Sequence, residues 1–234
     1  MKLPISQRLL CCAEMVPPGG RVADVGTDHG YLAVYLVRQG IARSVTATDL
    51  RQKPLEKARR NAARFGAADR IGFLQCDGLS GVGPETVDTV VCAGMGGDLI
   101  RMILEASPWV KTRGCTLVLQ PQSAGQDLRR YLTGNGFEIE RETLVRDGGF
   151  LYTVLRASPG ESAPLTPGEQ YATPQLLASG SPLIPEYLGR IEEALRKTAA
   201  GLARAEEPQP RKLDYYRQAL REITEMRSQY ADSR

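Results

Sequence analysis

The 234 residues, 42% of them hydrophobic, have the composition of a globular protein with room for one large domain, or for one domain and an appendage. The formal net charge of +3 permits binding to nucleic acid without requiring it. The sequence holds no run of about 18 apolar residues and no long apolar run after its basic start, so we expect neither a membrane span nor a signal peptide.

The cysteines form no C-x-x-C pair, and the one histidine cannot complete a usual zinc site. We therefore expect no metal, and we expect thiols that are buried and reduced, as in a cytoplasmic protein. The cysteines are Cys11, Cys12, Cys76, Cys92 and Cys115.

Helix-like and strand-like segments alternate along the first two thirds of the chain. After a helical pattern at 5–15, the predicted strands are 21–25, 44–48, 71–75, 87–92 and 115–119, and the predicted helices are 31–38, 53–65, 97–106 and 125–135. Two last strands, 137–145 and 150–156, flank Arg-Asp-Gly-Gly at 146–149, which is typical of a hairpin turn. This order predicts an α/β fold with a Rossmann-like, doubly wound, mostly parallel seven-stranded sheet whose one reversed strand lies at an edge.

The C-terminal third has a different composition. Residues 158–182 are rich in Pro, Gly and Ser and are predicted to form a linker with at most a short turn of helix. Two amphipathic helices are predicted over 183–234, broken by Glu-Glu-Pro-Gln-Pro at 206–210, and their alternating spacings predict an α-helical coiled-coil hairpin. The predicted seam positions are Ile184, Leu188, Ile191, Leu195, Thr198 and Leu202, and then Leu213, Tyr216, Leu220, Ile223, Arg227 and Tyr230.

The most informative stretch is 22–30, where an apolar strand runs into a turn with glycines at Gly26 and Gly30 and then into a helix. The turn lacks the middle glycine of a dinucleotide-binding G-x-G-x-x-G, and it places the carboxylates of Asp24 and Asp28 beside the ligand. Two carboxylates match a cation better than a pyrophosphate. S-adenosylmethionine carries an ammonium and a sulfonium and no phosphate, so the turn favours this cofactor over NAD. The alternative is a tight turn that holds no ligand.

Further candidate cofactor residues follow the next two strands, because open parallel sheets bind ligands at the carboxyl ends of their strands. Asp49 stands about twenty residues after the turn, where a carboxylate can accept hydrogen bonds from both ribose hydroxyls, and Leu50 follows it. Asp77 can accept a hydrogen bond from the adenine amino group, and Cys76 or Gly78 can offer a backbone N–H to the ring. The alternative for Asp77 is a capping role after the strand.

The next two strands end in Ala-Gly-Met-Gly-Gly at 93–97 and in Gln-Pro-Gln at 120–122. We expect Ala93 and Gly94 to contact the cofactor, since the glycines let the backbone approach a flat ring closely. The alternative is a glycine-rich helix entry with Met95 in the core. The two glutamines either read a base edge or satisfy a loop. The predicted substrate-binding residues are Met95, Gly96, Gly97, Gln120 and Gln122.

The turn at 24–32, the runs at 93–97 and 119–122 and the helical tail together resemble the bacterial tRNA adenine-22 N1-methyltransferase family, which has the class I methyltransferase layout. The resemblance covers nearly the whole chain. Gly30 stands where a small residue such as alanine is expected, and Asp49 where glutamate is common. The resemblance implies a catalytic domain that binds S-adenosylmethionine over 1–157, a coiled-coil domain that helps to hold tRNA over 183–234, and no metal. Position 22 is implied by the resemblance alone.

The resemblance sets the chemistry that we expect of the turn. Adenine N1 is a neutral nucleophile that attacks the sulfonium methyl without first losing a proton, and the product ring is cationic. Asp28 is the candidate catalytic carboxylate beside that charge. His29 positions the base or moves a proton, or it only bonds the turn backbone. Asp24 holds the turn or the cofactor ammonium.

Other functions remain open from the sequence. A class I methyltransferase that acts on another RNA base, a small molecule or a protein would share the fold and the cofactor. A binding module without catalysis would not need Asp28, and an NAD-dependent oxidoreductase is a further alternative. A basic cluster either meets RNA phosphates or forms a solvated helix face. Its residues are Arg51, Lys53, Lys57, Arg59, Arg60 and Arg64.

Overall fold

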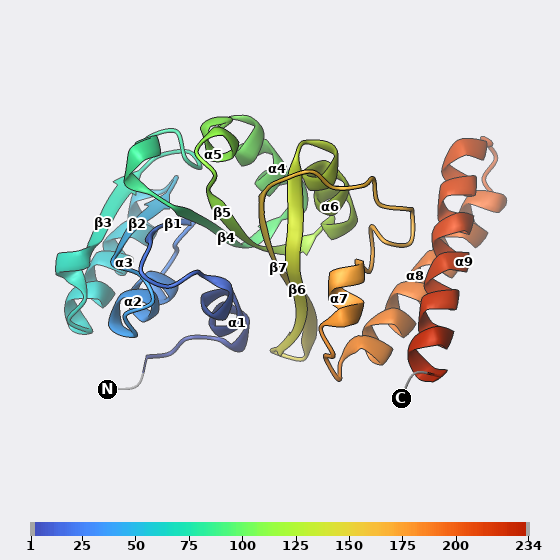
Figure 1. The fold of residues 1–234 in the computed structure, drawn as a ribbon, viewed down its shortest axis with the longest axis horizontal. Coiled ribbons are helices and arrows are strands. Elements are labelled where there is room, and N and C mark those ends of the chain that lie inside the picture. The colour runs from blue at the N-terminus through green and yellow to red at the C-terminus, as the bar shows by residue number, and fades with distance from the viewer. Residues whose placement is uncertain (1–2, 233–234) are drawn as a thin grey trace.

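The computed structural model describes residues 3–232, within which seven strands form one sheet with helices on both faces and a helical pair at one end (Figure 1). The strands are β1 (Arg21–Val25), β2 (Ser44–Asp49), β3 (Ile71–Gln75), β4 (Thr89–Gly96), β5 (Thr116–Ser123), β6 (Phe137–Asp147) and β7 (Phe150–Pro159). The α-helices are α1 (Gln7–Met15), α2 (Tyr31–Arg38), α3 (Gln52–Arg64), α4 (Gly97–Glu105), α5 (Trp109–Thr112), α6 (Gly125–Gly134), α7 (Pro174–Ala178), α8 (Ile184–Ala203) and α9 (Pro210–Asp232). Two short 3₁₀ turns are η1 (Ala68–Arg70) and η2 (Pro84–Thr86).

The predicted doubly wound, mostly parallel sheet is confirmed, with strand order β3-β2-β1-β4-β5-β7-β6. The predicted place of the reversed strand is wrong: β7 pairs antiparallel with both β5 and β6 and therefore lies inside the sheet. The physical reason is burial. Val154 and Leu155 of β7 are fully buried, whereas β6 exposes Glu138 and Glu140 along one face. The more apolar strand of the hairpin takes the inner position, and the charged one takes the edge.

Both faces of the parallel strands are packed, as their continuous apolar runs require. On one face, Val91 and Val118 join a core with the apolar sides of α1 and α2. On the other, Cys92 and Leu119 join a core with α4, α5 and α6. The alternation of neighbouring residues between two cores fixes the register of β4 against β5.

The strands β4 and β5 run further than predicted. The glycine-rich run at 93–97 was expected as a loop, but β4 continues to Gly96 and pairs with β5 through shifts in register. Met95 lies opposite Pro121, and Gly96 lies opposite Ser123. The two strand ends therefore form one irregular, bulged platform at the carboxyl edge of the sheet.

The segment at 158–182, predicted as a linker with at most a short turn of helix, packs against the rest of the protein in part of its length. It contains α7, for which the Thr173 hydroxyl accepts the N-cap hydrogen bond from the backbone N–H of Leu176. Ala172, Thr173 and Leu176 are fully buried, in a third core shared with Leu144 of β6 and with α8 and α9. A threonine cap followed by Pro174 starts this short helix within a composition that suggests a loop.

The predicted helical hairpin is present as α8 and α9, which lie side by side (Figure 1); residues 233–234 of the predicted range lie outside the described residues. Two seam positions differ from the prediction. Thr198 is exposed and Ala199 is buried in its place. The side chain of Arg227 is 55% exposed and donates a hydrogen bond to Glu192 from outside the seam. A helix of 3.6 residues per turn drifts away from a 3.5-residue repeat, which shifts the buried stripe.

Candidate active site

The turn after β1 runs through left-handed backbone. Gly26, Asp28 and Gly30 have φ values of +69°, +50° and +70°. Glycine is required at position 30 on a second ground, because a Cβ atom there would lie 2.8 Å from the Cβ of Ala58 in α3. The backbone N–H of Thr27 donates to the carbonyl of Thr48, which joins the turn to the end of β2.

Asp24 lies beneath this turn. It is 4% exposed and accepts a hydrogen bond of 2.6 Å from the hydroxyl of Thr27. Burial raises the pKa of Asp24 to about 6, although the hydrogen bonds from Thr27 and the Ala33 backbone act in the opposite direction. Of the two roles predicted for Asp24, these contacts favour holding the turn.

Asp28 and His29 occupy the tip of the turn. Their side chains are 63% and 43% exposed, and 3.5 Å separates the Asp28 Oδ2 from the His29 Nε2. The imidazole stacks on the ring of Tyr31, with the ring centroids 5.6 Å apart. The side-chain amide of Asn61 donates to the His29 carbonyl, which ties the turn to α3. The two candidate catalytic groups thus lie together in a position that a large substrate can reach, and their catalytic roles stay a prediction.

Hydrogen bonds also join the ends of β2 and β3. Asp49 is 8% exposed, and its Oδ1 accepts from the backbone N–H of Arg51 at 2.9 Å. The Cys76 backbone N–H donates to the Asp49 carbonyl, and the Thr48 hydroxyl donates to the Gly78 carbonyl at 3.0 Å. These hydrogen bonds hold the predicted ribose and adenine residues in one fixed group.

Two other predicted cofactor residues are open to solvent. Leu50 is 64% exposed beside Asp49, and Asp77 is exposed after β3. Asp77 and Gly78 line a cavity of about 220 Å³ that extends toward Ile103 of α4. The structure places these residues at one sheet edge, with Asp77 on its α4 side.

The glycines at 93–97 have protein neighbours that explain them. A Cβ on Gly94, which has a φ of +80°, would lie 3.0 Å from the guanidinium of Arg8, and one on Gly97 would clash with the Ala124 carbonyl. Met95 is half-buried against the core, and its methyl group lies over Gly26 of the β1 turn. The expected approach to a flat ring therefore stays a prediction, while left-handed backbone accounts for Gly94 and close packing against the Ala124 backbone accounts for Gly97.

Gln120 is fully buried, and its amide is occupied by the protein itself. Its Oε1 accepts from the Arg8 guanidinium at 2.6 Å and from the Gly94 backbone N–H at 3.0 Å, while its Nε2 donates to the Pro121 carbonyl. These contacts favour the alternative that Gln120 satisfies a loop. Gln122, two residues later, is exposed at the strand end and remains a candidate for contact with a base.

Sequence reasoning missed Arg8. It comes from α1, 112 positions before Gln120, and its guanidinium also lies 5.9 Å from the ring of Tyr152 and 4.0 Å from the Asp147 carboxylate. It thereby links the end of β4 to the β6–β7 hairpin. No local pattern in residues 5–15 carries this signal, because the partners are set by the topology of the sheet.

Within residues 3–232 no group of three or more His, Cys, Asp and Glu side chains could hold a metal ion, and no helix is long and apolar enough to cross a membrane. The cysteines are free, and four of them are buried. Burial raises the pKa of the Cys92 thiol to about 12 and that of Cys11 to about 11, which keeps both protonated near neutral pH.

Known proteins are similar to this chain in sequence and in fold. The model of a methyltransferase domain matches residues 5–155. A Bacillus subtilis protein named tRNA (adenine(22)-N(1))-methyltransferase is 34% identical over 160 residues, which cover 68% of this chain and 67% of that protein.

Solved structures cover more of the chain. A Streptococcus pneumoniae protein solved in complex with S-adenosyl-L-methionine aligns with a TM-score of 0.80 at 28% identity, over 95% of this chain and 99% of that one. The structure of the B. subtilis m1A22 tRNA methyltransferase aligns with a TM-score of 0.78 at 26% identity, over 99% of both chains. The predicted fold and family are thus confirmed, and the chain belongs to the methyltransferase-domain family and, within it, to the family of the B. subtilis tRNA (adenine(22)-N(1))-methyltransferase.

Proposed function

We propose that this protein transfers a methyl group from S-adenosylmethionine to N1 of an adenine in tRNA, at position 22 as in the name of its B. subtilis relative. One observation carries the proposal beyond family membership. The turn after β1 presents the carboxylate of Asp28 where a dinucleotide-binding protein presents backbone N–H groups to a pyrophosphate. This acidic edge suits a cationic cofactor.

The chemistry of the residues fits S-adenosylmethionine, which supplies an electrophilic methyl group on its sulfonium when bound. The nearly buried Asp49 offers carboxylate oxygens for ribose hydroxyls at the end of β2. Gly26 has no side chain, so the turn can approach the ligand with its backbone. Asp24 supports this turn from below. The proposed cofactor contacts are Gly26, Gly30, Asp49, Leu50, Cys76, Asp77, Gly78, Ala93 and Gly94.

For the transfer step, the protein has to align the adenine and stabilise the positive charge that develops on its ring. Asp28 accepts a hydrogen bond from the adenine amino group and lies beside that charge. His29, 3.5 Å from Asp28, positions the base against the turn. Both side chains are exposed, so a base that has left its stack can reach them.

Two features support tRNA as the substrate. We propose that residues 183–234 form a coiled-coil domain that helps to hold the tRNA beside a catalytic domain at 1–157. On α3, which contacts the β1 turn through Ala58, the side chains of Lys53, Lys57 and Arg60 are exposed and available to phosphates. The free cysteines and this substrate support a cytoplasmic location.

The test is transfer of label from radioactive S-adenosylmethionine to a tRNA transcript, followed by digestion to nucleosides and mapping of the labelled position. We expect label in 1-methyladenosine at position 22, and none in a transcript with guanine at that position. Label in another nucleoside, in a protein or in a small molecule would assign the chain to one of the alternative methyltransferase classes.

A further inference from the structure

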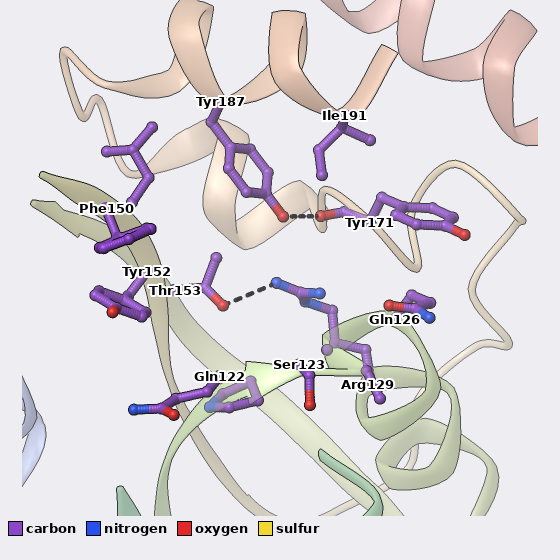
Figure 2. Close-up of a pocket in the computed structure, with 14 residues that line it drawn as sticks. Gln122, Ser123, Gln126, Arg129, Phe150, Tyr152, Thr153, Tyr171, Tyr187 and Ile191 are labelled. Carbon is purple, nitrogen blue, oxygen red and sulfur yellow. Dashed lines mark hydrogen bonds between the residues drawn. The ribbon is translucent and has the colours of Figure 1, made fainter. Parts of the chain in front are cut away.

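A groove of about 470 Å³ lies between the end of β5, the start of β7 and the helix α8 (Figure 2). It is separate from the cofactor residues at the ends of β1, β2 and β3. Figure 2 shows Tyr187 and Ile191 of α8 pointing toward Thr153 of β7 and Arg129 of α6, with Phe150 and Tyr152 at one side of the groove. Those that define its walls are Gln122, Ser123, Phe150, Tyr152, Tyr187 and Ile191.

The lining is neutral. Arg129 is the one charged side chain among the described residues that line the groove, and it is 2% exposed and paired with the buried carboxylate of Glu142. The other lining groups are aromatic rings, aliphatic carbons, amides and hydroxyls. Phosphate groups and charged peptides would find no counter-charge here. A flat, uncharged group with hydrogen-bonding edges fits, and an unpaired nucleobase has this chemistry.

The groove adjoins the proposed site of methyl transfer. Ser123 and Ala124, which line the groove, form the turn against which the end of β4 packs. A Cβ on Gly96 would lie 3.1 Å from the Ser123 hydroxyl, and one on Gly97 would clash with the Ala124 carbonyl. The turn at Ser123 and Ala124 therefore borders the groove and also contacts the end of β4, where we propose that the methyl group is transferred. A single nucleic-acid strand can therefore place one base at the proposed site of methyl transfer and another base in the groove.

Phe150 supplies the stacking surface. It is 64% exposed at the start of β7, and its ring lies 6.3 Å from that of Tyr152. The floor below is held by hydrogen bonds from Arg129 to the Thr153 hydroxyl and from the Tyr187 hydroxyl to the Tyr171 carbonyl, both seen in Figure 2. A rigid floor and an exposed ring form a preorganised platform for a base.

We infer that this groove binds an unpaired nucleobase of the tRNA, next to the methylated adenine, stacked on Phe150. The inference rests on the proposed function and adds to it a second base-binding subsite, built jointly by the catalytic domain and α8. It accounts for a large aromatic side chain that no core requires in the described part of the chain.

The test combines protein variants with altered tRNA. Phe150→Ala should raise KM for tRNA roughly 10-fold or more, because base–aromatic stacking contributes about 1–3 kcal/mol per base. The Kd for S-adenosylmethionine should not change. Phe150→Tyr keeps the ring and should restore KM. The exposed side chain makes folding of both variants expected, and their thermal midpoints check it.

The second arm uses transcripts that carry an abasic nucleotide on either side of the target adenine. With the wild-type protein, one of the two abasic transcripts should raise KM about as much as Phe150→Ala raises it on the intact transcript. On that abasic transcript, Phe150→Ala should show no further rise in KM. The inference would be overturned by an unchanged KM in Phe150→Ala, or by an equal rise in KM on the abasic transcript in both proteins. A change in oligomeric state in place of a change in KM would also overturn it. Failure of the wild-type protein to methylate any tRNA would instead refute the proposed function.

Discussion

At the scale of single residues, the β1 and β2 ends hold three carboxylates in three different environments. Asp24 is buried beneath the turn, Asp49 is nearly buried at the sheet edge, and the side chain of Asp28 is 63% exposed at the tip. Environment decides what a carboxylate can do. The buried one supports structure, the second accepts hydrogen bonds from a ligand at a fixed place, and the third can meet a substrate as large as tRNA.

Asp28→Asn should lower kcat for tRNA methylation by about 10-fold or more, because it removes the negative charge beside the cationic product ring. Binding of S-adenosylmethionine should weaken less than kcat falls, since the change removes one charge of the acidic edge but keeps the turn, because asparagine also tolerates the φ of +50° at this position. Single-turnover methylation and calorimetry measure the two quantities. The control is Asp69→Asn, an exposed aspartate in η1, which should leave both unchanged.

Asp24 makes the stability of the protein depend on pH. Its folded pKa of about 6 lies above the ordinary value of 3.8, so its stabilising contribution is complete below the lower value and is lost as pH rises through the higher one. Between about pH 7 and about pH 5, the wild-type protein should gain about 1 kcal/mol relative to Asp24→Asn, which still accepts from Thr27. Urea unfolding of both proteins at the two pH values measures this difference. An equal response to pH in both would show that Asp24 titrates normally.

The sequence predicts the local part of this site well. Asp24 lies near the end of β1, Asp28 follows it and Asp49 ends β2, and both strands are plain in the pattern, so their arrival at one edge could be foreseen. The sequence leaves two roles open for Gln120 and cannot choose between them, because a partner of its amide, Arg8, comes 112 positions earlier in the chain. Side chains whose partners come from distant elements carry no signal in their own neighbourhood.

At the scale of elements, the bulged end of β4 packs closely against the turn before α6. Gly97→Ala should destabilise the protein by roughly 1–3 kcal/mol, because the added methyl group meets the Ala124 carbonyl in a packed region. The matched control is Gly201→Ala in α8, where a methyl group meets nothing within 4 Å. This second change should stabilise by up to about 1 kcal/mol through helix propensity. Chemical unfolding compares the two, and equal effects would contradict the packing described.

The elements themselves differ in how far the sequence predicts them. The apolar strands β1 to β5 are found because a strand buried on both faces is apolar throughout. The inner place of β7 depends on a comparison of burial along both strands of the hairpin. The helix α7 agrees with the short turn of helix that the sequence allows in this Pro-rich segment, but five residues are too few for a periodic pattern to fix its position, which Thr173 and Pro174 set.

At the scale of the whole molecule, one buried ion pair ties the catalytic domain to the C-terminal part. Arg129 of α6 is bonded to Glu142 of β6, which also accepts from the Thr173 hydroxyl at 2.7 Å. Arg129 in turn donates to the Gln170 carbonyl at 3.1 Å. Three segments of the chain, α6, β6 and residues 170–173, therefore meet at one pair of opposite charges, beneath the groove of Figure 2.

Glu142→Ala should cost about 3–5 kcal/mol in unfolding free energy, because it leaves the buried guanidinium of Arg129 without a counter-charge. Glu140→Ala, on the same strand, removes a carboxylate that pairs with the half-buried Arg156, and it should cost no more than about 1 kcal/mol. Urea denaturation measures both. Similar losses in the two variants would show that the buried pair does not join the two parts of the molecule.

The most direct test of the account is calorimetric titration of the purified protein with S-adenosylmethionine and, separately, with NADH. The acidic sheet edge predicts saturable binding of S-adenosylmethionine, weakened about 10-fold or more in Asp49→Asn through loss of charged hydrogen bonds to the ribose. It predicts no binding of NADH. Tight binding of NADH, together with no heat from S-adenosylmethionine, would contradict the account.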